Sequence, residues 1–138
     1  MKNKFILTAS LILVLFSFYK VANSNEFVFE TNEINISEKG NITEATEGMA
    51  KSIKQNFLIK AKKFRYNNEL SILIAFNGIA YSPDDNLEIN ADNFIYNNKE
   101  YLLETKGNVV IKDIKNNILI ESQSIFFDNK NKIVSSKV

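Results

Sequence analysis

Hydrophobic and polar residues alternate along much of the chain after its first two dozen residues. Leu87, Ile89 and Ala91 alternate with polar residues, which is the period-two pattern of a strand with one buried face. Phe94 and Tyr96 continue the apolar series with the opposite parity. One extra residue must therefore be absorbed near Asn93, by a bulge or by a bend in the strand.

This pattern recurs at spacings of 30, 30 and 31 residues, which indicates about four tandem copies of one unit. Five columns match across the copies: Phe27, Phe57, Leu87 and Ile118; Phe29, Ile59, Ile89 and Ile120; Thr31, Ala61, Ala91 and Ser122; Ile34, Phe64, Phe94 and Ile125; Ile36, Tyr66, Tyr96 and Phe127. A glycine follows in the first three copies, at Gly48, Gly78 and Gly107, and we expect it to mark the end of a strand.

Polar turn signals separate the apolar runs. Asn97-Asn98 begins the short segment NNKE, and asparagine tolerates the positive φ that tight hairpins need. Sustained helical periodicity is absent from the repeats, although 47–56 could form one helical turn between strands. Each unit predicts about three short strands, so four stacked units predict roughly a dozen strands in an elongated all-β body. Such a body leaves an open strand edge at each end.

The first two dozen residues have the composition of a signal peptide. The basic segment MKNK precedes the apolar run FILTASLILVLFSF, and Ala22 and Ser24 occupy the −3 and −1 positions of a cleavage site. The apolar run is shorter than the ~20 residues of a spanning helix, so an uncleaved membrane anchor is the less favoured alternative. The sequence thus predicts a signal peptide over residues 1–24 and one exported domain over residues 25–138.

Composition restricts the chemistry that the chain can perform. Its 138 residues include no cysteine and no histidine, so disulfides, thiolate metal ligands and the commonest general base are excluded. The formal net charge is +1, and it becomes −2 without the three lysines of the signal segment, which does not favour a nucleic-acid partner. Phosphate-binding loops and nucleophile elbows are also missing. We expect a protein that is not an enzyme and uses no cofactor or metal.

The inward-facing columns form the first candidate site. They predict either a closed core or, where two sheets splay apart, an apolar groove for acyl chains, and the alternation is the same in both cases. The candidate groove-lining residues are Phe29, Phe57, Ile59, Phe64, Tyr66, Leu87, Ile89, Phe94, Tyr96, Leu103, Ile118, Ile120, Ile125 and Phe127.

A basic stretch forms the second candidate site. Its side chains alternate with inward positions, so we expect them on the outer face or at the bend. They form either a solvated surface or a contact with anionic lipid head groups at the rim of the groove. The four residues are Lys60, Lys62, Lys63 and Arg65. The acids Asp84, Asp85 and Glu88 lack the spacing of a calcium site and have no histidine partner, so we expect no metal or general-acid site there.

The repeat resembles a known family. The stretch LEINADNFIYNNKEYLLETKGNV, residues 87–109, has an apolar-x-apolar-x-Ala-Asp segment, an aromatic-x-Tyr segment and a return strand that ends in Gly-Asn-Val. It resembles the OstA-like domain of the lipopolysaccharide-transport family, and the copies at 27–48, 57–78 and 118–136 resemble it more loosely. That family includes a periplasmic bridge protein (LptA-like), the N-terminal domain of an outer-membrane assembly protein (LptD-like) and an anchored inner-membrane member (LptC-like). The resemblance leaves the choice among these three open.

The resemblance implies an OstA-like β-jellyroll, with two antiparallel sheets in an open V, located in the periplasm. Such domains join head to tail through their edge strands, so the expected partners are other jellyroll components of the export bridge or further copies of this chain. The interior would carry the lipid A acyl chains of lipopolysaccharide between the inner and outer membranes. The alternative is a structural or adhesive β-repeat protein with a closed core that self-associates through its edge strands.

Overall fold

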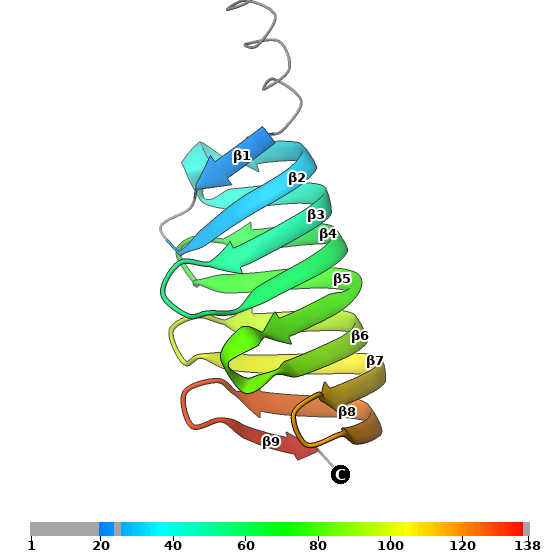
Figure 1. Ribbon diagram of the computed structural model, residues 1–138. Helices are drawn as coiled ribbons and strands as arrows, with labels where there is room; N and C mark the ends of the chain where they lie inside the picture. The colour runs from blue at the N-terminus through cyan, green and yellow to red at the C-terminus, as the bar shows by residue number, and fades with distance from the viewer. Residues whose placement is uncertain (1–19, 24–25, 137–138) are drawn as a thin grey trace, which may run out of the picture.

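A single antiparallel β-sheet makes up most of the computed structural model, which describes residues 20–23 and 26–136 (Figure 1). Its nine strands pair in chain order: β1 (Lys20–Asn23), β2 (Phe27–Ser37), β3 (Ile42–Ser52), β4 (Leu58–Asn67), β5 (Ile72–Ser82), β6 (Leu87–Asn97), β7 (Leu102–Asp113), β8 (Ile118–Asp128) and β9 (Ile133–Ser136). Two 3-10 turns, η2 (Glu38–Gly40) and η3 (Pro83–Asp85), connect strands.

The all-β prediction is confirmed, whereas the expected dozen short strands is wrong. The described residues form fewer and longer strands, and β2 to β8 each contain between 10 and 12 residues. The segment 47–56 continues β3 as far as Ser52 and is not helical. No helix in the described part of the chain is long and apolar enough to cross a membrane.

Strands β2 to β8 bend near their middle. Between β2 and β3, pairing runs to Thr31–Gly48 and resumes at Glu33–Thr46, which leaves one residue of each strand outside the ladder. The pairing of β6 with β7 shifts between Asn90 and Asn93, which confirms the irregularity predicted near Asn93. In Figure 1 the strands curve round along the right-hand side, so that the two halves of the sheet face each other.

We name these two halves the first limb and the second limb. The first limb contains the residues on the Phe27 side of the bend: 27–31, 48–52, 57–61, 78–82, 87–91, 109–113 and 118–122. The second limb contains 33–37, 42–46, 63–67, 72–76, 93–97, 102–106 and 124–128. At the ends of the sheet, β1 pairs only with the first limb, and β9 pairs only with the second limb.

The three repeat glycines, Gly48, Gly78 and Gly107, lie at the bend rather than at the strand ends where we expected them. A Cβ at Gly48 would meet the carbonyl oxygen of Glu30, and a Cβ at Gly78 would meet that of Lys60. Gly107 has a φ of +82°, in the left-handed region that favours glycine. The bend brings neighbouring backbones too close for a side chain, so the glycine marks the fold within a strand.

The predicted turn at Asn97-Asn98 is confirmed. The Asn97 Oδ1 accepts hydrogen bonds from the backbone N–H groups of Lys99 (3.0 Å) and Glu100 (3.2 Å). Other turns repeat this arrangement, because Asp128 Oδ1 accepts from Lys130 and Asn131 at 3.0 and 2.9 Å. The later turns each contain a residue with positive φ: Ser71, Asn86, Tyr101, Asn117 and Lys132.

The hydrophobic core lies between the two limbs. Aromatic side chains of the first limb contact those of the second, with ring centroids 5.2 Å apart for Phe27 and Tyr66 and 6.0 Å apart for Phe29 and Phe64. Because strand parity changes at the bend, both halves of a strand turn their apolar residues toward this shared interior.

Candidate functional site

Most of the candidate groove-lining residues are buried in the interior. Twelve are at most 8% exposed: Phe29, Phe57, Ile59, Phe64, Tyr66, Leu87, Ile89, Phe94, Tyr96, Leu103, Ile125 and Phe127. The other two, Ile118 and Ile120, are 49% and 43% exposed, because they lie on β8 at the C-terminal end of the sheet. That end has no further strand beside residues 118–124 among the described residues.

The interior is filled by the protein's own side chains. Phe57 and Tyr96, from opposite limbs, stack at a centroid distance of 5.0 Å and an interplanar angle of 27°. A cavity of about 510 Å³ lies elsewhere, on the outer face. The alternation of apolar and polar residues is compatible with a closed core and with an open groove. In this structure the interior is a closed core.

Polar side chains connect the limbs at the tips, where the strands turn. Tyr66 Oη donates to Glu26 Oε2 at 2.7 Å, and Ser71 Oγ donates to Glu26 Oε1 at 3.3 Å. Glu26 precedes a first-limb strand, whereas Tyr66 and Ser71 flank a second-limb turn. This carboxylate therefore holds one tip of each limb together, on the side of the sheet opposite to the bend.

A second bridge between the limbs lies farther along the sheet. Lys132 Nζ lies 2.9 Å from Asp85 Oδ2, and Ser82 Oγ donates to the same oxygen at 2.6 Å. Burial alone would raise the pKa of Asp85, but the hydrogen bonds from Ser82 and Lys132 and the charge of Lys132 outweigh it and lower that pKa. Asp85 is therefore the anionic half of a limb-to-limb ion pair.

The tips between these two bridges contain polar atoms without partners. Tyr96 Oη and Asn98 Oδ1 are buried, and neither makes a hydrogen bond of ordinary length and angle among the described residues. Burial raises the pKa of Tyr96 to about 12, although a hydrogen-bonding interaction with the side chain of Asn129 acts in the opposite direction. Asn56, on the facing tip of the first limb, donates instead to Asp84 Oδ1 on the next tip of the same limb, at 2.9 Å. Nothing in the sequence pattern distinguishes this pair of tips from its neighbours.

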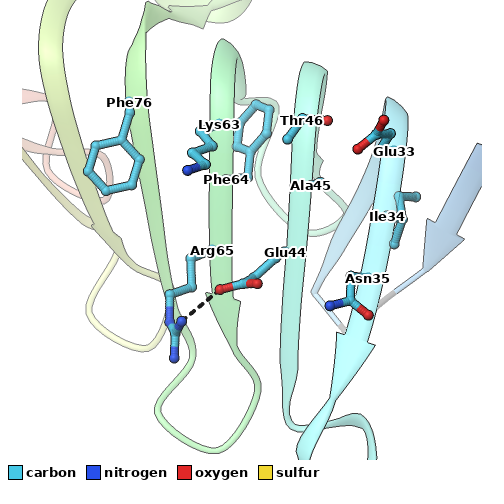
Figure 2. Close-up of a pocket in the computed structure, with 10 residues that line it drawn as sticks. All are labelled: Glu33, Ile34, Asn35, Glu44, Ala45, Thr46, Lys63, Phe64, Arg65 and Phe76. Atoms are coloured by element: carbon cyan, nitrogen blue, oxygen red, sulfur yellow. Dashed lines mark hydrogen bonds and ion pairs between the residues drawn. The ribbon is translucent and has the colours of Figure 1, made fainter.

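The basic stretch lies on the outside of the sheet, as the alternation predicted. All four of its side chains are exposed: Lys60, Lys62, Lys63 and Arg65. Figure 2 shows Lys63 and Arg65 beside the 510 Å³ outer cavity, with Arg65 Nη1 bonded to Glu44 Oε1 at 2.7 Å. Phe76, which is 38% exposed, also lines this cavity. These cations therefore lie at the bend and on the outer face.

The acidic residues form structural contacts. Asp85 belongs to the ion pair with Lys132, and Glu88 lies 3.8 Å from Lys112 and accepts from Asn90 at 3.2 Å. No group of three or more carboxylates that could hold a metal ion occurs in the part of the chain that the structure describes.

Both ends of the sheet have unpaired strand segments. At the N-terminal end, β1 covers Val28–Thr31 of β2 and leaves 33–37 without a neighbour beyond it in the described chain. At the C-terminal end, β9 covers Ile125–Asp128 of β8 and leaves 118–124. That second edge is apolar, since Leu119 is 58% exposed next to Ile118 and Ile120. The repeat pattern predicted open edges but not which halves stay open.

The predicted signal peptide lies largely outside the described residues, which omit 1–19 and 24–25. Strand β1 falls within the segment whose removal the sequence predicts. Comparison of the sequence with models of known protein families and with curated proteins finds no match in either case.

Proposed function

We propose that the protein is a non-enzymatic lipid carrier of the OstA-like kind, a component of a lipopolysaccharide-export bridge in the periplasm. The observation that carries this proposal is the interior, which is apolar from Phe27 on β2 to Phe127 on β8. Each methylene moved from water into such an interior contributes about 0.8 kcal/mol, so an acyl chain gains much by entering it. The two limbs would then be the two antiparallel sheets of a V-shaped jellyroll.

Carriage requires the interior to open. The limbs are joined covalently along the bend, whereas their tips are held by the Glu26 and Asp85 bridges and by aromatic contacts. Parting the tips would expose the aromatic columns as a groove without breaking any strand ladder. An acyl chain that replaced the contacts between the limbs would restore the lost burial.

The strand edges support assembly with other jellyrolls. Neighbouring strands are antiparallel throughout, so strand direction alternates along the sheet from β1 to β9. The β2 edge of one copy could therefore pair with the β9 edge of another copy as antiparallel strands. Such a head-to-tail junction would continue the ladder of the second limb from one copy to the next. Removal of residues 1–24 would also uncover Val28–Thr31 of β2 for pairing. Such junctions would align successive interiors.

A second candidate function is favoured by the closed packing. Side chains such as Phe94 and Tyr96 have no exposed surface, and the limbs are in contact. A structural or adhesive β-repeat protein would keep this core closed permanently and use only its edge strands for binding. The two functions make opposite predictions for the interior.

Photo-crosslinking from adjacent positions on β6 distinguishes the two functions. A photoreactive residue replaces Phe94, which is buried, or Ile95, the next residue, which is only partly buried. A third probe replaces Leu119 at the open edge. The carrier predicts that the probe at 94 captures lipopolysaccharide and the probe at 95 does not. Capture of protein at 119 with no lipid at 94 would instead establish the structural function.

A further inference from the structure

Three facing pairs of tips line the side of the molecule opposite to the bend. In the first pair, Glu26 bridges to Tyr66 and Ser71. In the third, Asp85 bridges to Lys132. The middle pair joins the turn at 53–56 to the strand end at Tyr96, where the ring of Phe57 stacks on that of Tyr96. The middle pair thus lacks the polar bridge that its neighbours have among the described residues.

This middle pair contains a buried donor and a buried acceptor. Tyr96 is 0% exposed and Asn98 is 3% exposed, and neither Tyr96 Oη nor Asn98 Oδ1 makes a hydrogen bond of ordinary geometry in the described chain, although the side chain of Asn129 lies near enough to Tyr96 to offset part of the rise in pKa that burial causes. An unsatisfied buried polar group costs about 1 to 3 kcal/mol, so native proteins rarely keep one without a use. The phenol also stays protonated across the ordinary pH range, since burial raises the pKa of Tyr96 to about 12.

We propose that Tyr96 and Asn98 form a binding site for the secondary amide of an N-acylated lipid. The Tyr96 hydroxyl would donate to the amide carbonyl, and Asn98 Oδ1 would accept from the amide N–H. This inference rests on the proposed carrier function. It adds that the middle pair of tips selects lipids whose acyl chain is attached through an amide. An ester or a plain alkyl chain offers no N–H, so it would leave Asn98 unsatisfied.

The surrounding contacts give the acyl chain a route into the interior. Phe57 lies immediately before β4 and covers the Tyr96 ring from the facing tip. Its displacement would open the aromatic interior directly below the amide site. The Glu26 and Asp85 bridges on either side would confine the opening to this middle position. An amide held at the tips would therefore place its chain between the limbs.

Binding of two matched amphiphiles tests the proposal. The probes are an N-acyl taurine and an alkyl sulfonate of equal length, titrated calorimetrically below their micelle concentrations. The wild-type protein should bind the amide about fivefold to tenfold more tightly, the preference that one or two net hydrogen bonds provide. Tyr96→Phe, which removes only the hydroxyl, should lower that preference severalfold, and Asn98→Ala combined with it should bring the two affinities together.

Tyr66→Phe is the matched control, because it removes the same atom from a tip whose hydroxyl is bonded to Glu26. Because it removes part of the Glu26 bridge, it can change the affinity for both probes, but it should leave the ratio of the two affinities unchanged. Equal binding of both probes by the wild-type protein, or an unchanged preference in Tyr96→Phe, would overturn the amide site while leaving the carrier function intact. Failure of the wild-type protein to bind either probe would overturn both. Thermal melting of each variant verifies that it is folded.

Discussion

At the scale of single residues, two tyrosines at equivalent positions of successive repeats differ in the hydrogen bonding of their hydroxyl groups. Tyr66 donates to the Glu26 carboxylate at 2.7 Å, whereas the Tyr96 hydroxyl is buried without a partner in the described chain. Removal of the first hydroxyl deletes a hydrogen bond to a charged group, but removal of the second relieves an unsatisfied donor. The same substitution should therefore have opposite effects at the two positions.

We predict that Tyr66→Phe lowers the free energy of unfolding by about 1.5 to 3 kcal/mol and that Tyr96→Phe raises it by about 1 kcal/mol. Chemical denaturation of both variants alongside the wild-type protein measures the difference. Each variant is the control for the other, since the volume change is identical. A loss of stability in Tyr96→Phe as large as that in Tyr66→Phe would contradict the assignment of partners.

The Asp85 ion pair predicts a specific dependence of stability on pH. Its folded-state pKa lies below the ordinary value of 3.8, so the ionised carboxyl stabilises the fold above that value and loses this contribution as the pH falls through the folded pKa. Asp85→Asn should be less stable than the wild-type protein at neutral pH. The difference in unfolding free energy should shrink below about pH 4. Denaturation series at several pH values measure it, and a difference that stays constant would refute the ion pair.

At the scale of elements, the alternation pattern predicts the position of the bend but not the strands that it joins. The change of parity between Ile89 and Phe94 correctly predicted an irregularity near Asn93. The prediction for the glycine positions is wrong, because a glycine between apolar runs indicates a turn as readily as a close approach of two backbones. The distinction depends on the neighbouring strand, which for Gly78 is β4 with its Lys60 carbonyl. The residues around Gly78 do not identify that neighbouring strand. The sequence pattern therefore predicts more strands, and shorter ones, than the structure contains.

Substitution of the bend glycines tests this element directly. Gly78→Ala should lower the unfolding free energy by about 3 kcal/mol or more, because its Cβ would meet the Lys60 carbonyl oxygen and Ala61. Gly40→Ala is the control: its added Cβ meets open space, and its φ of +90° should cost only about 1 kcal/mol. Comparable melting temperatures for the two variants would mean that the bend is not tightly closed.

At the scale of the whole molecule, the candidate interior was largely predictable and its closed state was not. Inward columns follow from periodicity, so twelve of the fourteen candidate residues are buried. Ile118 and Ile120 were misplaced, because their exposure depends on where the sheet ends. Alternation is identical in a closed and an open interior, and therefore only the contacts across the tips, such as Phe57 with Tyr96, revealed that the limbs meet.

The open β8 edge predicts concentration-dependent self-association. Leu119→Lys should weaken association by at least about tenfold, because an added charge on an open edge opposes strand pairing. Leu70→Lys is the control, since Leu70 is equally exposed at 57% but lies in a turn. Sedimentation velocity at a series of concentrations measures both variants. Equal association of the two variants would show that the β8 edge takes no part in self-association.

The central claim is that the closed interior opens at its tips to take up lipid. Because the chain has no cysteine, spin labels can be placed uniquely at Lys54→Cys and Glu100→Cys, on facing tips, and as a control at Lys62→Cys and Asn93→Cys beside the bend. Pulsed electron paramagnetic resonance then measures both distances with and without lipopolysaccharide. Our account predicts that lipid lengthens the distance between the tips and leaves the distance at the bend unchanged. An unchanged distance between the tips at saturating lipid would contradict it.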